Sequence, residues 1–406
     1  MIQMATLHWR KTGAGPSRAV AVGLVALTAL TLAGCADGGS GSGSGDLKIA
    51  VIADLTGPQT ALGLGSPGVL AAVDEINQDG GINGRKVTVV GPFDAQSTAD
   101  GGGTAAQQAL SETPDVVIES TSSAGVAASL PVFANSSIPV IDLSGPQEAV
   151  TPPIPLHYSL NLEAGQVSRT LLSGSRVVSG VPQTDRMKVA VVGLATPAID
   201  SYLKKIQADA AGANVDLTSV VRTEITQTSF SSQAAALVKD APDTVLLIDS
   251  VAGTVLEAKA LNTAGFKGQI IATHGVAQES SFAKVAAANY SAVRLGAVAT
   301  AGSPLADAAK AKGVQAQAQD TSYFAQGWAA AYTAAAILQK CGASCSPEGF
   351  QAAAEGAGPI NVPADAMYGP ITFTPDKHYG LTAVQLYRWD SQSQKPVAVG
   401  TPTQVG

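Results

Sequence analysis

The sequence predicts an α/β protein of two lobes, each built on a parallel β-sheet covered by helices. Short runs of aliphatic and β-branched residues alternate along the chain with segments whose apolar residues recur at helical spacing. The strand-like runs are apolar throughout, as expected for strands buried on both faces. A length of 406 residues exceeds one ordinary domain. These three observations together favour two lobes of one class.

The first lobe begins with an expected strand at residues 47–53. Val69, Val73 and Ile76 then recur at helical spacing, and Asp79-Gly80-Gly81 ends that helix. Further along, we expect strands at 86–90, 115–118 and 138–141, with helices at 105–110 and 126–134.

The same alternation continues in the second lobe. We expect strands near 187–192, 244–248 and 269–272, and a helix at 253–263 separates the last two. Strands that alternate with helices in this way form parallel sheets, because each crossover needs a covering helix.

The N-terminus has the order of a secretory signal. A basic stretch, Arg10 to Arg18, precedes an apolar run at 19–32 and then Ala33, Gly34 and Cys35. The run of about 14 residues is shorter than the roughly 20 that span a bilayer. Because residues 32–35 match a bacterial lipobox, we expect 1–34 to be a lipoprotein signal peptide and Cys35 to be lipidated. A plain signal peptide and an uncleaved anchor are the alternatives.

Residues 35–45 are expected to form the lipidated cysteine and a flexible Gly/Ser tether. Cleavage after residue 34 would remove three basic and no acidic residues, so the net charge of −7 becomes −10. That acidity argues against a nucleic-acid partner. No later segment has 18 uninterrupted apolar residues, so lipid alone would hold the protein at the extracytoplasmic face of the membrane.

Cys341 and Cys345 lie four residues apart with Gly and Ser between them. In an exported protein this spacing favours a small disulfide loop at the end of a helix. A metal site and a redox pair are weaker alternatives, because further ligands are missing and the redox motif has two intervening residues.

Loops at the carboxyl ends of the expected strands are rich in hydroxyls and glycines, and ligands of open α/β sheets bind at such ends. Hydroxyls and backbone N–H groups at helix starts suit a carboxylate ligand, although N-capping explains any one loop. The loops are residues 54–58, 120–123, 142–145, 193–198, 249–250 and 273–275.

Enzyme motifs are not indicated. Residues 63–68 satisfy Gly-x-Gly-x-x-Gly, but they follow the first strand by about nine residues, whereas a dinucleotide site needs the motif directly after the strand. His157, His274 and His378 are too sparse to suggest a metal site. We therefore expect no catalysis, no cofactor and no metal.

Four segments, residues 52–58, 76–85, 326–332 and 368–373, resemble the Leu/Ile/Val-type substrate-binding proteins of ABC importers. The resemblance extends over 46–395, and its most specific part is the segment INQDGGINGR at 76–85. It implies the type I periplasmic binding fold, in which two lobes joined by a three-segment hinge close on an amino acid. The chain would cross this hinge near residues 163, 298 and 383. The N-terminal lobe would then be 46–163 plus 298–383, and the C-terminal lobe 164–297 plus 384–406.

The resemblance also implies a ligand site. Ser123 matches the serine that holds the ligand carboxylate, with Ser122 beside it, and Ser144 lies in a loop of further polar contacts. Trp328 and the loop from Thr56 to Leu62 would form walls of the ligand cleft. In the second lobe, the corresponding strand-end positions are Ala198, Ser250 and His274.

Two positions depart from the family pattern. His274 stands where the family has the glutamate that binds the ligand ammonium, and a second-lobe tyrosine is replaced near Ser250 or Val251. A histidine cannot supply a fixed negative charge at neutral pH. Asp249 or Asp54 could replace that charge. Otherwise a carboxylate without an amine, or a neutral amide-like compound, becomes the expected ligand.

The sequence thus predicts a lipid-anchored, monomeric solute receptor that presents a small polar metabolite to an ABC permease and its ATPase. The alternative is a sensory module that passes ligand occupancy to a signalling partner.

Overall fold

The computed structural model describes residues 45–145, 151–311, 313–314, 320 and 322–405. All the described residues belong to one compact unit of the chain. The predicted signal peptide, Cys35 and the tether up to residue 44 lie outside the described residues. Within the described helices, none is both long enough and apolar enough to cross a membrane.

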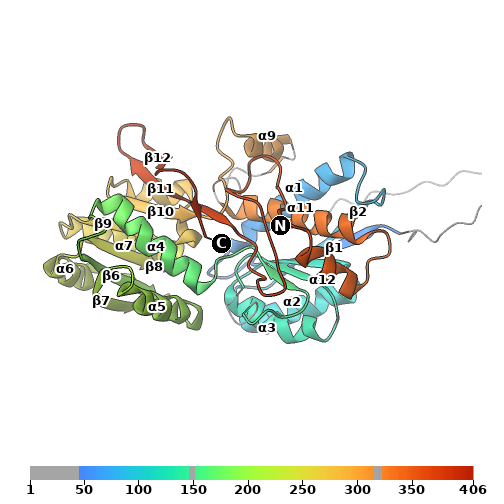
Figure 1. The fold of residues 1–406 in the computed structure, drawn as a ribbon, viewed down its shortest axis with the longest axis horizontal. Helices are drawn as coiled ribbons and strands as arrows, with labels where there is room; N and C mark the ends of the chain where they lie inside the picture. Colours follow the sequence, from blue (N-terminus) through green and yellow to red (C-terminus); the bar gives the residue numbers. More distant parts are fainter. Residues whose placement is uncertain (1–44, 146–150, 312, 315–319, 321, 406) are drawn as a thin grey trace, which may run out of the picture. The chain divides into compact units, whose positions relative to one another are not determined.

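The first sheet is parallel in every described strand pair and has the order β2-β1-β3-β4-β5. Figure 1 labels its strands β1 and β2. Its strands are β1 (Leu47–Ala53), β2 (Val87–Asp94), β3 (Val116–Ser120), β4 (Val140–Asp142) and β5 (His157–Ser159). The helices that accompany it are η1 (Leu62–Leu64), α1 (Gly65–Gln78), α2 (Ala99–Ser111), α3 (Ser123–Ala134), α9 (Pro304–Ala311), α11 (Ser322–Cys341) and α12 (Pro347–Glu355).

The second sheet has the order β12-β11-β10-β9-β8-β6-β7, with β13 paired to β11. Its strands are β6 (Met187–Leu194), β7 (Val215–Thr223), β8 (Thr244–Ile248), β9 (Gln269–Ala272), β10 (Tyr290–Arg294), β11 (Ala383–Asp390), β12 (Lys395–Ala398) and β13 (Thr403–Gln404). Its helices are α4 (Ala164–Ser179), α5 (Pro197–Ala210), α6 (Ser231–Asp240), α7 (Val251–Thr263), η3 (His274–Val276) and α8 (Glu279–Val285).

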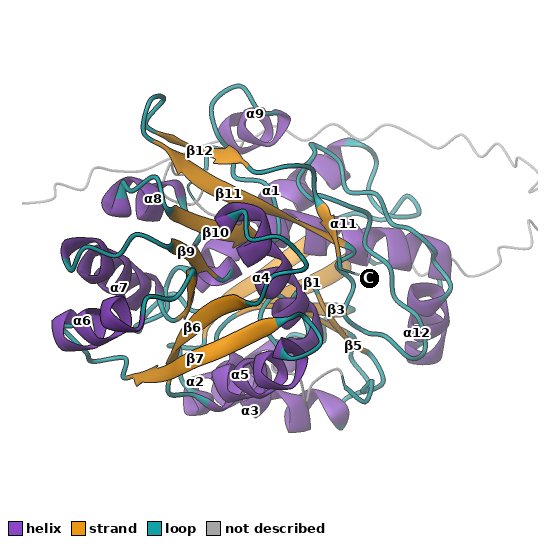
Figure 2. Cartoon of the chain, turned by 60° about the vertical axis from the view of Figure 1, so that its left-hand side comes forward, coloured by secondary structure: helices purple, strands orange, loops and turns teal. Residues whose placement is uncertain are grey.

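Both sheets bury both faces, which explains their uninterrupted apolar strands. In β1, Ile49 and Val51 pack with α1 and α11, whereas Ala50 and Ile52 pack in a separate cluster with α2. In the second sheet, alternate residues of β6 and β8 divide between a cluster with α4 and α5 and another with α6, α7 and α8. Figure 2 shows α4 over the sheet with α5 beside it.

The predicted fold class is confirmed, with one difference in the second sheet. That sheet is mixed, because β11 pairs antiparallel to β10, and β12 and β13 pair antiparallel to β11. The chain leaves β10 at Arg294 and returns in β11 with Gln385 opposite that residue. A strand that re-enters at the end where its neighbour finished must run the opposite way, so in this sheet only β6 to β10 run parallel to one another.

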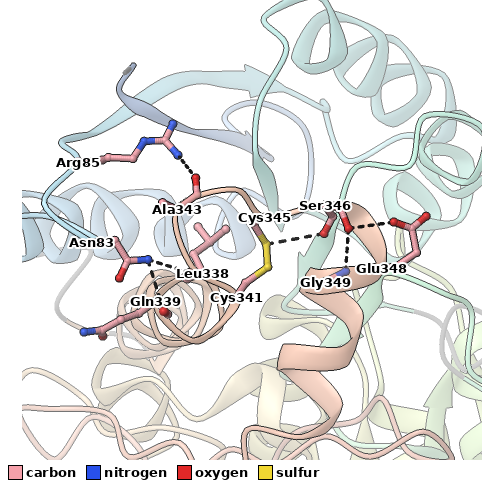
Figure 3. Close-up of a disulfide and its surroundings, with 10 residues drawn as sticks. All are labelled: Asn83, Arg85, Leu338, Gln339, Cys341, Ala343, Cys345, Ser346, Glu348 and Gly349. Carbon is pink, nitrogen blue, oxygen red and sulfur yellow. Dashed lines mark hydrogen bonds between the residues drawn. A yellow bond between two sulfur atoms is a disulfide. The ribbon is translucent and has the colours of Figure 1, made fainter. Parts of the chain in front are cut away.

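The Cys341 and Cys345 sulfurs form a disulfide at the end of α11, with an S–S distance of 2.07 Å (Figure 3). The short loop that it closes is tied to the start of the domain by Arg85. The guanidinium of Arg85 donates to the Ala343 carbonyl at 3.4 Å and to the Gly45 carbonyl at 2.7 Å. The first described residues are therefore held beside this loop.

Candidate ligand site

Each sheet has one point where the strand order reverses direction. From β1 the chain moves out to β2 and then returns to β3 on the other side of β1. In the second sheet, β7 and β8 flank β6 in the same way. Ligands of α/β sheets bind beyond the carboxyl ends of the strands at such switch points. The loops after β1 and β3, and after β6 and β8, contain most of the predicted site residues.

Asp54 organises the first switch point from a fully buried position after β1. Its carboxylate accepts hydrogen bonds from the Ser97 N–H at 2.9 Å, the Thr121 hydroxyl at 2.6 Å and the Ser122 N–H at 2.9 Å. Burial raises the pKa of Asp54, and these hydrogen bonds oppose that shift. Through Thr121 and Ser122, the Asp54 carboxylate holds the loop after β3 in place.

Ser122 and Ser123 begin helix α3. The Ser122 hydroxyl caps the helix by accepting from the Gly125 N–H at 3.3 Å. The Ser123 hydroxyl donates to the Ser144 carbonyl at 3.0 Å, and the Ser144 hydroxyl donates to the Thr121 carbonyl. The structure therefore brings these three predicted residues together at the positive end of α3, where the first N–H groups lack helical partners.

Asp142 holds the loop after β4. Its carboxylate accepts from the Ser144 N–H at 3.0 Å and the Ser159 hydroxyl at 2.9 Å, and the His157 ring Nε2 lies 2.8 Å away. All of Asp142, His157 and Ser159 are buried. This network positions Ser144 without adding a free charge to the loop.

The predicted walls occupy different environments. Thr56 is exposed, and its hydroxyl donates to Asp94 at 2.7 Å. Leu62 begins η1, and its carbonyl accepts from the Ser120 hydroxyl. Trp328 is fully buried in α11 between Phe324 and Tyr332, with ring centroids 6.4 and 5.4 Å away. Within the described part of the chain, its indole N–H has no hydrogen-bond partner.

The loops after β6 and β8 each begin a helix. Thr196 caps α5 by accepting from the Ile199 N–H at 3.4 Å, and Ala198 lies half-buried in the first turn. Ser250 caps α7 by accepting from the Gly253 N–H at 3.1 Å. Asp249 accepts from the Ser250 N–H at 2.5 Å and from the Thr223 hydroxyl, so its carboxylate is hydrogen-bonded both to its own loop and to the end of β7.

His274 starts η3 after β9, with its ring Nδ1 3.2 Å from the Thr273 hydroxyl oxygen. Burial lowers the pKa of His274 to about 4. The imidazole is therefore uncharged at neutral pH, where it can donate or accept one hydrogen bond but cannot neutralise an ammonium group.

Three side chains that the sequence analysis did not select connect the two halves of the site. The Tyr202 hydroxyl on α5 hydrogen-bonds to Asn161, and burial raises the pKa of Tyr202 to about 12. Tyr323 of α11 is within electrostatic range of Tyr202, and its hydroxyl lies 3.2 Å from where a Cβ on Gly275 would be. Tyr202 stands four residues after Ala198, on the same helix face, and that spacing was the available signal.

The predicted residues thus form two groups, one around Ser123 and Ser144 and one along the loops of the second sheet. Between described residues, no hydrogen bond or ion pair joins a predicted residue of one group to one of the other. Asn161 follows β5, Tyr202 lies on α5 and Tyr323 lies on α11.

Residues 46–395 match the family model described as periplasmic binding protein. The chain belongs to this family. The predicted resemblance is thereby confirmed. A curated relative, Leu/Ile/Val-binding protein homolog 4 of Brucella abortus (strain 2308), is 35% identical over 101 residues, which cover 25% of this chain. The match spans only 23% of that relative's length.

Solved structures agree on the fold of this periplasmic binding protein. A branched chain amino acid ABC transporter from Thermus thermophilus with bound valine has a TM-score of 0.74 and 16% identity, and the match covers 88% of this chain and 97% of that one. A solute binding protein of an ABC transporter from Rhodopseudomonas palustris BisB5, in complex with 3,4-dihydroxy benzoic acid, has a TM-score of 0.73 and 14% identity, with 89% and 98% covered. These two proteins share a fold and hold different classes of ligand.

Proposed function

We propose that this protein is the extracytoplasmic solute-binding lipoprotein of an ABC importer, and that it takes a small carboxylate without an ammonium group. Family membership and the polar groups at both switch points support this proposal. The ligand would lie between an N-terminal lobe, 46–163 plus 298–383, and a C-terminal lobe, 164–297 plus 384–406. Closure of the lobes would bury it and create the surface that the permease recognises.

The observation that favours a ligand without an ammonium group is that the nearby carboxylates are already hydrogen-bonded within the protein. Asp54, Asp142 and Asp249 each accept at least two hydrogen bonds from neighbouring strands and loops. His274, which the family resemblance would put in the place of a ligand-binding glutamate, is uncharged at neutral pH because burial lowers its pKa. An ammonium group enclosed here would lose its water without gaining a dedicated counter-charge, which is costly.

A carboxylate finds better partners. The start of α3 presents backbone N–H groups that suit an anion, and the Ser123 hydroxyl can exchange its hydrogen bond to the Ser144 carbonyl for one to the ligand. Tyr202 and Tyr323 add aromatic surface and hydroxyl groups for the rest of the ligand. An aromatic or aliphatic acid fits this combination better than a zwitterion.

Thermal unfolding of the full chain against a ligand panel tests the proposal. The panel contains leucine, valine, benzoate, 3,4-dihydroxybenzoate, short aliphatic acids and the amides of the aromatic acids. A true ligand at about a hundred times its dissociation constant should add about 2.7 kcal/mol to the free energy of unfolding. We expect the acids to stabilise the protein and the amino acids to have no effect. Stabilisation by leucine or valine would overturn the ligand class, and no stabilisation by any compound would argue against a solute receptor.

A further inference from the structure

A pocket away from the strand-end loops lies between α4 and α5, which run side by side along the second sheet (Figures 1 and 2). Its volume is about 630 Å³, and its lining includes Glu163, Gly165, Arg169, Lys204 and Lys205. A neighbouring cavity of about 670 Å³ shares Arg169. None of the residues proposed for the solute site lines either cavity.

Charged side chains converge over Gly165 in the first turn of α4. A Cβ on Gly165 would lie 3.1 Å from Glu163 Oε1, 3.2 Å from Arg169 Nη1 and 3.4 Å from Lys205 Cε. The first two approaches are tighter than most Cβ contacts and the third is at the edge of ordinary van der Waals contact, so a larger residue would crowd the charged groups. The absence of a side chain at Gly165 leaves the floor of the pocket open.

Positive charge is in excess around this pocket. Among the described residues, its lining contains three cations, Arg169, Lys204 and Lys205, and one carboxylate, Glu163. Lys205 is paired with Asp209 at 2.7 Å. Among the described residues, neither Arg169 nor Lys204 forms an ion pair within 4.0 Å.

Lys377, in the segment between α12 and β11, is close enough to Glu163 and Arg169 to be affected by their charges. Burial lowers the pKa of Lys377, the nearby carboxylate of Glu163 raises it, and the charge of Arg169 lowers it further. Arg169 and Lys377 therefore repel each other across this region. In a protein with a net charge of −7, the exposed cations Arg169 and Lys204 make this pocket locally positive, which favours a bound anion.

We propose that the pocket between α4 and α5 binds a small oxyanion with at least two negative charges, such as a phosphate group. The guanidinium of Arg169 can engage two oxygens at once, and Lys204 can act as a point charge on a third. This site does not depend on the identity of the transported solute, so it stands or falls separately from the proposed function.

Calorimetric titration of the full chain at low ionic strength tests the proposal with inorganic phosphate, glycerol 3-phosphate and citrate as probes. The variants are Arg169→Gln and Lys204→Gln, singly and together. Lys239→Gln, which removes an exposed lysine of α6, is the matched control. We expect the wild type and the control to bind at least one phosphate probe, each single variant to bind about tenfold more weakly, and the double variant to lose binding.

A further variant, Gly165→Ala, should weaken binding without any change of charge, because it fills the pocket floor. Thermal unfolding of each variant establishes that it folds. Binding of inorganic phosphate would identify a free ion, and binding of glycerol 3-phosphate alone would identify a phosphate ester, including a lipid headgroup. Either result supports the proposal. The proposal is overturned if the wild type binds none of the three anions, or if the folded double variant binds them as tightly as the wild type.

Discussion

Glu257 lies on α7 with 1% of its surface exposed, close to Asp249 at the end of β8. Burial raises the pKa of Glu257 to about 9, and the negative charge of Asp249 adds to the shift. The folded chain therefore keeps a proton that the unfolded chain releases above its usual pKa of 4.5. As pH rises from 4.5 toward 9, this group lowers the free energy of unfolding by up to about 1.4 kcal/mol per pH unit.

Replacement of this acid should stabilise the protein at neutral and alkaline pH. We expect Glu257→Gln to raise the free energy of unfolding at pH 7.5 by on the order of 1–3 kcal/mol, and to have little effect near pH 4.5. Denaturant unfolding between pH 4.5 and 9 measures this difference. Glu112→Gln, at an exposed position, is the control and should leave the pH profile unchanged. A parallel profile for Glu257→Gln and the wild type would contradict the buried-proton explanation.

A comparison of variants at Ser123 and Ser346 distinguishes an effect on ligand binding from an effect on helix capping. We expect Ser123→Ala to weaken binding of the solute about tenfold, since one hydrogen bond to a charged ligand would be lost. Ser346 caps α12 away from the switch points, and Ser346→Ala should cost about 1 kcal/mol of stability with no change in affinity. Titration of both variants with the stabilising compound measures this. Equal affinities would remove Ser123 from the site.

At the scale of elements, α1 and α11 pack at glycine-lined positions. A Cβ on Gly327 would overlap the Gly65 carbonyl, and one on Gly68 would overlap the Phe324 carbonyl. Substitution must therefore push the two helices apart. We expect Gly327→Ala to cost about 1–3 kcal/mol in the free energy of unfolding.

The control for this prediction is Gly174→Ala on α4. There, a Cβ would meet its nearest neighbours at 3.7 and 3.8 Å, which are ordinary contacts. Because alanine is the better helix former, this variant should gain about 0.5–1 kcal/mol. Thermal unfolding of the two variants should shift in opposite directions, and a loss of equal size in both would contradict the close-packing argument.

The disulfide loop is a second element-scale feature. Removal of the bond in Cys341→Ser/Cys345→Ser should cost about 2 kcal/mol, because the loop it closes is short. Unfolding with and without a thiol reductant checks this. The reductant should lower the stability of the wild type to that of the double variant and should leave the double variant unchanged.

How well a strand could be predicted depended on its burial. The bounds of β1, β8 and β9 were predicted to the residue, because strands covered on both faces are continuous apolar runs between turn signals. The strand β7 was not predicted, because it is an edge strand whose apolar residues are interrupted by Asp216, Thr218 and Ser219. The strand β5 has only three residues, and β11 depends on a partner about ninety positions earlier.

At the scale of the whole molecule, the candidate site was predictable where it follows from topology. The sequence places Ser122, Ser123 and Ser250 after strands, and the switch points then bring such loops to one edge. Tyr202 and Tyr323 could not be selected, because they lie within helices and meet only through the tertiary arrangement of α5, α11 and η3. Local pattern carries no information about such contacts.

The proposed lipid anchor gives a prediction for the complete protein in its bacterial host. Cys35→Ser removes the acylated sulfur, so the variant should move from the detergent phase to the aqueous phase in detergent phase separation. Its thermal unfolding in the aqueous phase should match that of the wild type, because Cys35 lies outside the unit Ser42–Gly406 that contains the described residues. Retention of the variant in the detergent phase would argue against Cys35 as the lipid attachment site.

The contact between Arg85 and Gly45 has a mechanical consequence. If the protein hangs from Cys35, any tension reaches the fold at this contact, beside the disulfide loop, and then passes into β1. β1 lies between β2 and β3, with ladder hydrogen bonds along both edges. A pull along its axis loads both ladders in shear, so many bonds must break together, whereas an edge strand pulled sideways would unzip one bond at a time. The position of β1 makes the attachment end of the protein suited to bearing load.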